Sequence, residues 1–238
     1  MLTPDTLYTD IITFCKAKAD ETIVKKYSRY FKEGYDAYGV AYPLMQEKVK
    51  SILSNPEVDL AFALKTSKLL IPGSKYEEPS FALMMVKAFK KQYAPDTFTE
   101  IGDWFNLGIR NWAHTDGLCS EIISVFLLKK IVDYKEMGNW KSGANKFQRR
   151  AVPVSLIKLM KETREVTEFV NFVDSLMMDT EREVRQGIGW FLREAWKLDP
   201  LPVEEFLLKY RDTGPRLIFQ YATEKMTHEE KSRFRRQK

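Results

Sequence analysis

The clearest structural signal in the chain is residues 184–195, which read VRQGIGWFLREA. Apolar side chains recur in this stretch at the spacing of one buried face of an α-helix, namely at Val184, Ile188, Phe191, Leu192 and Ala195. On a turn of about 3.6 residues, Trp190 points to the opposite, polar side of that helix. The segment therefore predicts an amphipathic helix that carries a large aromatic side chain on its charged face.

Trp190 has two explanations at this point. A neighbouring helix can cover the indole, as happens for most tryptophans in a multi-helix protein, or the indole can face a ligand. Gly187 and Gly189 come shortly before it, and each costs about 1 kcal/mol relative to alanine inside a helix. Each also leaves the backbone open to close approach. Both explanations stay open on the sequence alone.

Helix signals recur along the whole chain. Capping residues and prolines predict helix starts at Thr3-Pro4, Pro43, Pro79, Asn111, Asn145, Thr180 and Pro202. Helix ends are predicted near Gly34, Gly73, Gly108, Gly138 and Pro200. The segments between these points show helical periodicity and no sustained alternation of apolar and polar residues. We therefore expect an all-α protein of about a dozen short helices.

The spacing of the landmarks favours a repeat architecture. Trp112, Arg150 and Trp190 follow one another at intervals of about 40 residues, the repeat length of HEAT- and armadillo-type helix pairs. Such pairs stack so that residues from successive repeats line one concave face. We expect a single HEAT-like domain over residues 1–238. The basic segment 227–238 is expected to be a C-terminal tail, which either contacts DNA or is a solvated end.

Composition narrows the function classes. The 238 residues are 44% hydrophobic, which is too apolar for a disordered chain, and no apolar run reaches the roughly 18 residues of a membrane span. Residues 1–5 show no secretory signal, so we expect a cytoplasmic protein. Two distant cysteines and two histidines argue against a disulfide framework and a metal cofactor. The net charge of +5 is compatible with a polyanionic partner.

Several side chains are candidates for chemistry. Trp112 and Asp116 are four residues apart at the start of a helix, so they share a face. Taken singly, the tryptophan is usually core and the aspartate usually a helix-dipole residue. Arg149 and Arg150 form either a solvated basic turn or a phosphate clamp. A cluster of tyrosines can pack between helices or contact phosphates, namely Tyr27, Tyr30, Tyr35, Tyr38 and Tyr42.

Four stretches, taken together and in order, resemble the DNA alkylation repair glycosylases of the AlkD type. They are residues 30–43 (YFKEGYDAYGVAYP), 111–116 (NWAHTD), 145–151 (NKFQRRA) and 187–194 (GIGWFLRE). The resemblance runs from about Tyr30 to Met226, and the last stretch is its most specific part. It implies a right-handed superhelical stack of antiparallel helix pairs that forms a concave basic cleft.

The resemblance also implies roles for individual residues. Asp116 corresponds to the catalytic carboxylate, and Trp112 and Trp190 correspond to the aromatic pair that packs against the lesion deoxyribose. Arg150 corresponds to the cation that holds the nearby phosphate, with Tyr30 and Arg193 as supporting contacts. The family excises cationic N3- and N7-alkylated purines from duplex DNA, and AlkD-type enzymes do so without extruding the base, unlike most glycosylases. We expect a monomeric, monofunctional enzyme that needs no cofactor.

Two departures from the family pattern concern Arg150. Phe147 stands where relatives often have tryptophan, and Pro153 is expected inside the helix that follows and can kink it. Three hypotheses remain: a glycosylase, a catalytically silent relative that binds distorted or branched DNA, and a protein-interaction scaffold. The family's aspartate, both tryptophans and the arginine are all present here, at Asp116, Trp112, Trp190 and Arg150, and this favours the glycosylase hypothesis.

Overall fold

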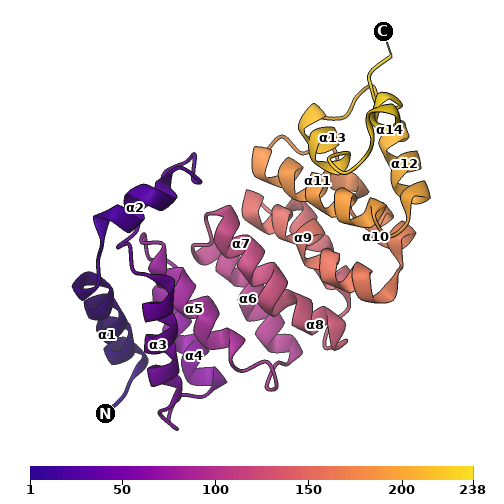
Figure 1. The fold of residues 1–238 in the computed structure, drawn as a ribbon. Helices are drawn as coiled ribbons and strands as arrows, with labels where there is room; N and C mark the ends of the chain where they lie inside the picture. Colours follow the sequence, from indigo (N-terminus) through magenta and orange to yellow (C-terminus); the bar gives the residue numbers. More distant parts are fainter. Residues whose placement is uncertain (238) are drawn as a thin grey trace. The chain divides into compact units, whose positions relative to one another are not determined.

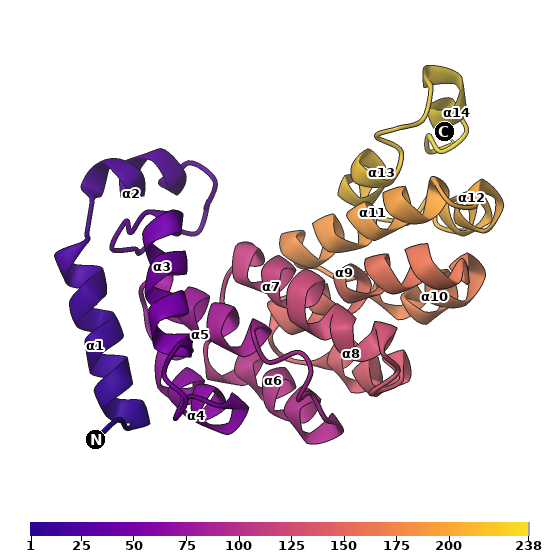
Figure 2. The same ribbon diagram turned by 60° about the horizontal axis from the view of Figure 1, so that its bottom comes forward.

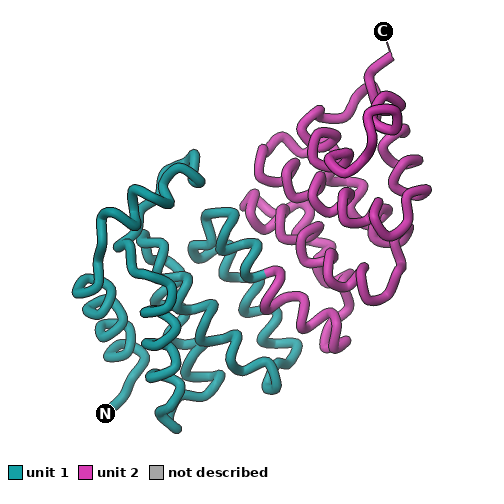
Figure 3. Tube along the Cα trace, viewed as in Figure 1, with its two compact units in different colours: residues 1–118 teal, residues 119–238 magenta. Residues whose placement is uncertain are grey.

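The computed structural model describes residues 1–237, and it is helical with no strand in that range. This confirms the all-α prediction. The chain divides after Leu118 into two compact units, residues 1–118 and 119–238 (Figure 3). No helix in the described range is long and apolar enough to span a bilayer.

Unit 1 contains seven α-helices in chain order (Figure 1). They are α1 (Pro4–Ala17), α2 (Glu21–Ser28), α3 (Tyr42–Leu53), α4 (Leu60–Leu70), α5 (Glu77–Lys87), α6 (Pro95–Leu107) and α7 (Trp112–Leu118). Helices α4 and α5 pack against each other, and α1 covers α4. The core of unit 1 is aromatic and aliphatic, with fully buried side chains such as Phe81, Trp104 and Ile11.

Unit 2 begins with a π-helix, η1 (Cys119–Ile123), followed by α8 (Ser124–Leu128) and the 3₁₀ segment η2 (Tyr134–Ser142). Its remaining elements are α9 (Lys146–Thr163), α10 (Val166–Phe172), η3 (Asp174–Leu176), α11 (Arg182–Trp196), α12 (Pro200–Lys209), α13 (Arg216–Ala222) and α14 (His228–Ser232). Helix α11 lies between α9 and α13 and packs extensively on both (Figures 1 and 2).

The predicted helix boundaries hold where a capping side chain marks them. The hydroxyl of Thr3 accepts a hydrogen bond from the Thr6 amide at 3.1 Å, and Asn145 Oδ1 accepts one from the Phe147 amide at 2.8 Å. Both are N-caps of the expected kind. Gly108 follows directly on the end of α6, as predicted.

Several predicted boundaries are wrong. Helix α2 ends at Ser28, six positions before Gly34, and α5 begins at Glu77, two positions before Pro79. Thr180 does not cap α11, which begins at Arg182 after Glu181. Gly138 does not end a helix, because it lies inside η2. Pro200 starts α12 instead of ending α11, since proline fits the first turn of a helix, where its missing N–H costs nothing.

The predicted buried stripe of α11 is confirmed. Its five members, Val184, Ile188, Phe191, Leu192 and Ala195, are all fully buried. Burying this stripe between α9 and α13 fixes the rotation of α11 about its axis, and with it the direction of Trp190.

Candidate functional site

The predicted site residues are divided between the two units. Tyr30, Trp112 and Asp116 belong to unit 1, and the other four belong to unit 2, namely Arg149, Arg150, Trp190 and Arg193.

Helix α7 carries Trp112 and Asp116 one turn apart, so both side chains leave the same face of the helix. Trp112 is exposed, at 39% relative accessibility of the residue, whereas Asp116 is half-buried. Asn111 caps this helix as predicted, because its Oδ1 accepts a hydrogen bond from the His114 amide at 2.9 Å. The carboxylate and the indole are therefore presented together from one short, capped helix.

The indole of Trp112 is held by the segment that follows α2. The Phe31 ring stacks on it, with 5.5 Å between ring centroids and 21° between ring planes. Trp112 Nε1 donates a hydrogen bond to the Tyr30 carbonyl oxygen at 3.3 Å. Tyr30 and Trp112 thus come together through the tyrosine backbone. The Tyr30 ring itself stays exposed.

None of the side chains of helix α2 is buried. Four exposed cations lie on α2 and directly after it, and none of them forms an ion pair within the described residues: Lys25, Lys26, Arg29 and Lys32. The tyrosine cluster divides here. Tyr27, Tyr30 and Tyr42 are exposed, whereas Tyr35 and Tyr38 are half-buried. The N-terminal part of the chain therefore presents an aromatic, cationic surface.

Arg150 lies on α9 and is 5% exposed. Its Nη1 donates a hydrogen bond to the Glu183 carbonyl oxygen at 2.6 Å, which ties it to the first turn of α11. A Cβ atom on Gly187 would lie 3.1 Å from Arg150 Cγ, so glycine at this position gives the arginine side chain its room. Helix α9 continues through Pro153 to Thr163.

Trp190 on α11 is half-buried. It is therefore neither fully covered by a neighbouring helix nor fully exposed, the two possibilities that the sequence left open. Gly189 beside it is explained by packing, because an added Cβ atom would lie 2.5 Å from Tyr221 Cβ and 2.9 Å from the Ile218 carbonyl oxygen. The close approach of α13 to α11 requires glycine here. The backbone at Gly189 is open to close approach, as expected, and the element that approaches it is helix α13.

Arg149 and Arg193 take part in ion pairs within unit 2. Arg149 Nε lies 2.6 Å from Asp179 Oδ2, and its Nη1 donates to the Gly143 carbonyl oxygen at 2.8 Å. Arg193 pairs with Glu224 through Nη1. The solvated basic turn that was the alternative for Arg149 and Arg150 is wrong, since both lie in α9 with little exposed side chain.

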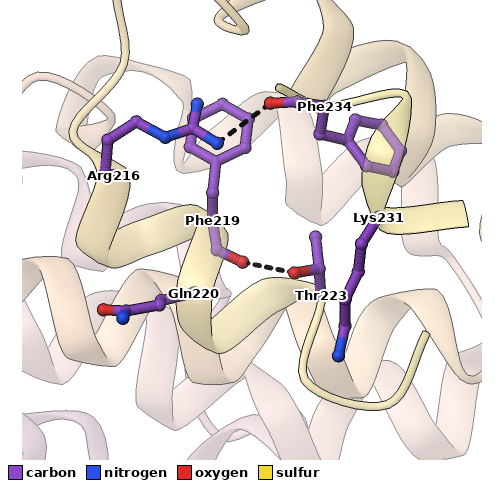
Figure 4. A pocket seen from close by; sticks show the side chains of 6 residues that line it. All are labelled: Arg216, Phe219, Gln220, Thr223, Lys231 and Phe234. Carbon is purple, nitrogen blue, oxygen red and sulfur yellow. Dashed lines mark hydrogen bonds between the residues drawn. The ribbon is translucent and has the colours of Figure 1, made fainter. Parts of the chain in front are cut away.

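A pocket of about 360 Å³ lies between α13 and the C-terminal segment (Figure 4). None of the predicted site residues lines it. The Arg216 guanidinium lies over the Phe219 ring at 4.2 Å and donates a hydrogen bond to the Phe234 carbonyl oxygen at 2.9 Å. Within the segment expected as a basic tail, Thr227 caps α14 and Phe234 is buried.

Sequence reasoning missed three residues around Trp112: Phe31, Tyr76 and His114. Phe31 and Tyr76 are far apart in the sequence and contact each other only through tertiary packing, so no local sequence pattern indicates them. His114 gives a local signal, because it stands three residues after the N-cap Asn111, where side chains return to the cap.

Comparison with known proteins gives a family and a fold. A family described as DNA alkylation repair enzyme matches residues 12–226. Two crystal structures from Streptococcus mutans resemble the chain, both with a TM-score of 0.58 and 18% identity. They are smu.31 of strain UA159, where the match covers 86% of this chain and 98% of that one, and AlkD2, with 87% and 99%. At this identity the likeness concerns the fold.

A search of curated proteins found no match. The family match alone spans most of the chain and includes every predicted site residue. The chain therefore belongs to the DNA alkylation repair enzyme family.

Proposed function

We propose that this protein is a monofunctional DNA glycosylase that hydrolyses the N-glycosidic bond of cationic N3- or N7-alkylated purines in duplex DNA. Family membership supports a role in DNA alkylation repair. The observation that carries the finer proposal is the arrangement on α7. Trp112, whose indole stacks on Phe31, is still 39% exposed, and the Asp116 carboxylate lies one turn further along the same helix.

The reaction needs what this pair offers. When the bond between C1′ and the purine nitrogen breaks, its electron pair neutralises the cationic base, which leaves, and positive charge develops on the sugar. A carboxylate stabilises that charge and orients water, whose oxygen attacks C1′ and whose proton passes to the carboxylate or solvent. An aromatic face adds about 0.5–2 kcal/mol of cation–π attraction. Because the leaving group is already activated, one carboxylate suffices and no general acid is needed.

The remaining predicted residues take supporting roles in this proposal. We propose, from the family resemblance, that Trp190 supplies a second aromatic face for the DNA and that Arg150 binds the phosphate beside the lesion. The N-glycosidic bond is cleaved while the base stays stacked in the duplex, and water attacks C1′ of its sugar. Tyr30, which is exposed, and Arg193 are supporting contacts to the DNA in this proposal. Arg149 is left out, because its guanidinium is bound to Asp179 and to the loop at Gly143.

A direct test incubates the wild-type protein with a duplex that contains 7-methylguanine at one position. Chromatography of the supernatant should show free 7-methylguanine, and the strand should become sensitive to alkali at the abasic site. Binding to the duplex without base release would contradict the enzyme proposal and leave a DNA-binding relative. Absence of salt-dependent DNA binding would contradict both and favour a scaffold.

A further inference from the structure

His114 closes the first turn of α7 together with Asn111. The Asn111 Oδ1 accepts from the His114 backbone amide at 2.9 Å, and Asn111 Nδ2 lies 2.8 Å from His114 Nδ1. The Asn111 side chain therefore caps the backbone of α7 through its oxygen and holds the His114 imidazole through its nitrogen. This turn separates Trp112 from Asp116, so its geometry sets the positions of both.

The partners of the imidazole fix its tautomer. His114 Nε2 lies 2.9 Å from the Tyr76 carbonyl oxygen, which can only accept a hydrogen bond. Nε2 therefore carries the proton, and Nδ1 accepts from the Asn111 amide. Ser80 Oγ also lies 2.9 Å from Nε2 and donates to the same carbonyl oxygen at 2.7 Å. The ring is 4% exposed, and burial lowers the pKa of His114 to about 4, so it is neutral at physiological pH.

A chain of ring contacts connects His114 with the exposed indole. The imidazole stacks on the Tyr76 ring at 4.4 Å, with 23° between the planes. The Tyr76 ring meets Phe31 edge to face at 5.6 Å, and Phe31 stacks on Trp112 at 5.5 Å. His114 thus touches both supports of the indole, namely the helix that carries it and the aromatic cluster behind it.

We propose that His114 is a positioning residue that holds α7 in the orientation in which Trp112 and Asp116 act together. It is buried and acts through its neighbours. The inference rests on the proposed glycosylase function, since that function gives the orientation its purpose. A displacement of about 1 Å in a catalytic pair can reduce a rate by 100-fold, so a residue that fixes this turn has a kinetic effect.

Two variants test this positioning. His114→Phe keeps a ring against Tyr76 and removes both hydrogen bonds of the imidazole. Asn111→Ser keeps an oxygen able to cap α7 and removes only the amide that binds Nδ1, so it serves if the first variant fails to fold. The matched control is Tyr93→Phe, which removes another buried hydrogen bond of unit 1, from Tyr93 Oη to the Val86 carbonyl oxygen at 3.0 Å.

The first measurement follows the indole itself. The five tryptophans are labelled with 5-fluorotryptophan, and Trp112→Phe identifies the ¹⁹F signal of residue 112. In His114→Phe and Asn111→Ser we expect that signal to shift or broaden while the other four stay in place. Tyr93→Phe should leave all five unchanged. An unchanged Trp112 signal in both variants, or a general change of all five, contradicts the proposal.

The second measurement follows the reaction. We expect the single-turnover release of 7-methylguanine to fall about 10-fold or more in His114→Phe, while the Kd for the duplex changes less than about 3-fold. Adding His114→Phe to Trp112→Ala should cost less than the product of the two single effects. Equal rates for wild type and variant, or fully multiplicative effects, overturn the inference. A wild type without base release defeats the proposed function, and the fluorine signals then decide the positioning alone.

Discussion

The buried imidazole of His114 makes stability depend on pH in a defined window. The folded protein holds this group with a pKa of about 4, against 6.5 for a free imidazole, because burial disfavours the charged form. Between these two values the unfolded chain binds more protons than the folded one. Stability from this group is therefore fully present above about pH 6.5 and is lost as the pH falls towards 4.

The size of the effect follows from the pKa difference. Each pKa unit corresponds to about 1.4 kcal/mol, so His114 should contribute a loss of about 2–3 kcal/mol between about pH 7.5 and pH 4.5. His114→Phe has no such group. We expect its free energy of unfolding to be lower than that of the wild type at neutral pH and the difference to shrink by that amount in acid. Urea unfolding followed by circular dichroism at about four pH values measures this directly. Parallel pH profiles of the two proteins would refute the reasoning.

Three further predictions concern the surface of α2, the α11–α13 packing and Arg149. We replace the four cations of α2 and its following turn by glutamine and measure the DNA-binding constant K at several salt concentrations. The slope of log K against log salt concentration should become shallower by about 0.9 for each DNA phosphate that these cations neutralise. The charge-matched control replaces four exposed lysines elsewhere in unit 1, namely Lys16, Lys18, Lys50 and Lys65. Gly189→Ala should lower the free energy of unfolding by about 1–3 kcal/mol in a urea titration, because its Cβ meets Tyr221 at 2.5 Å, and an effect below that of Gly187→Ala would contradict this. Arg149→Leu should destabilise the protein by about 1–3 kcal/mol and leave the Kd for DNA nearly unchanged, since the pair with Asp179 is internal; a large drop in DNA affinity in a folded variant would return Arg149 to the binding site.

The sequence predicted the elements whose signals are local. The buried stripe of α11 could be read from apolar spacing alone, and Thr3, Asn111 and Asn145 act as the N-caps that their side chains indicate. The errors lie where one residue type serves two purposes. Pro200 fits the end of one helix as well as the start of the next, and neighbouring packing decides between them.

The candidate site shows the same limit more sharply. The spacing of Trp112 and Asp116 placed them on one helix face, but the stacking of Phe31 and Tyr76 behind the indole joins segments that are far apart in the sequence. The opposite case is Arg149, whose charge suggested phosphate binding although its partner Asp179 lies 30 positions away. Such pairings arise from tertiary packing, which periodicity does not encode.

The central claim is that Asp116 takes part in cleaving the glycosidic bond. The most direct test compares single-turnover release of 7-methylguanine from a duplex by wild type and by Asp116→Asn, with the exposed Asp103→Asn on α6 as a charge-matched control. Losing a carboxylate that stabilises developing charge should slow release by about 100-fold or more, while Asp103→Asn keeps the wild-type rate and all three proteins bind the duplex equally. Equal release rates for wild type and Asp116→Asn would contradict the account.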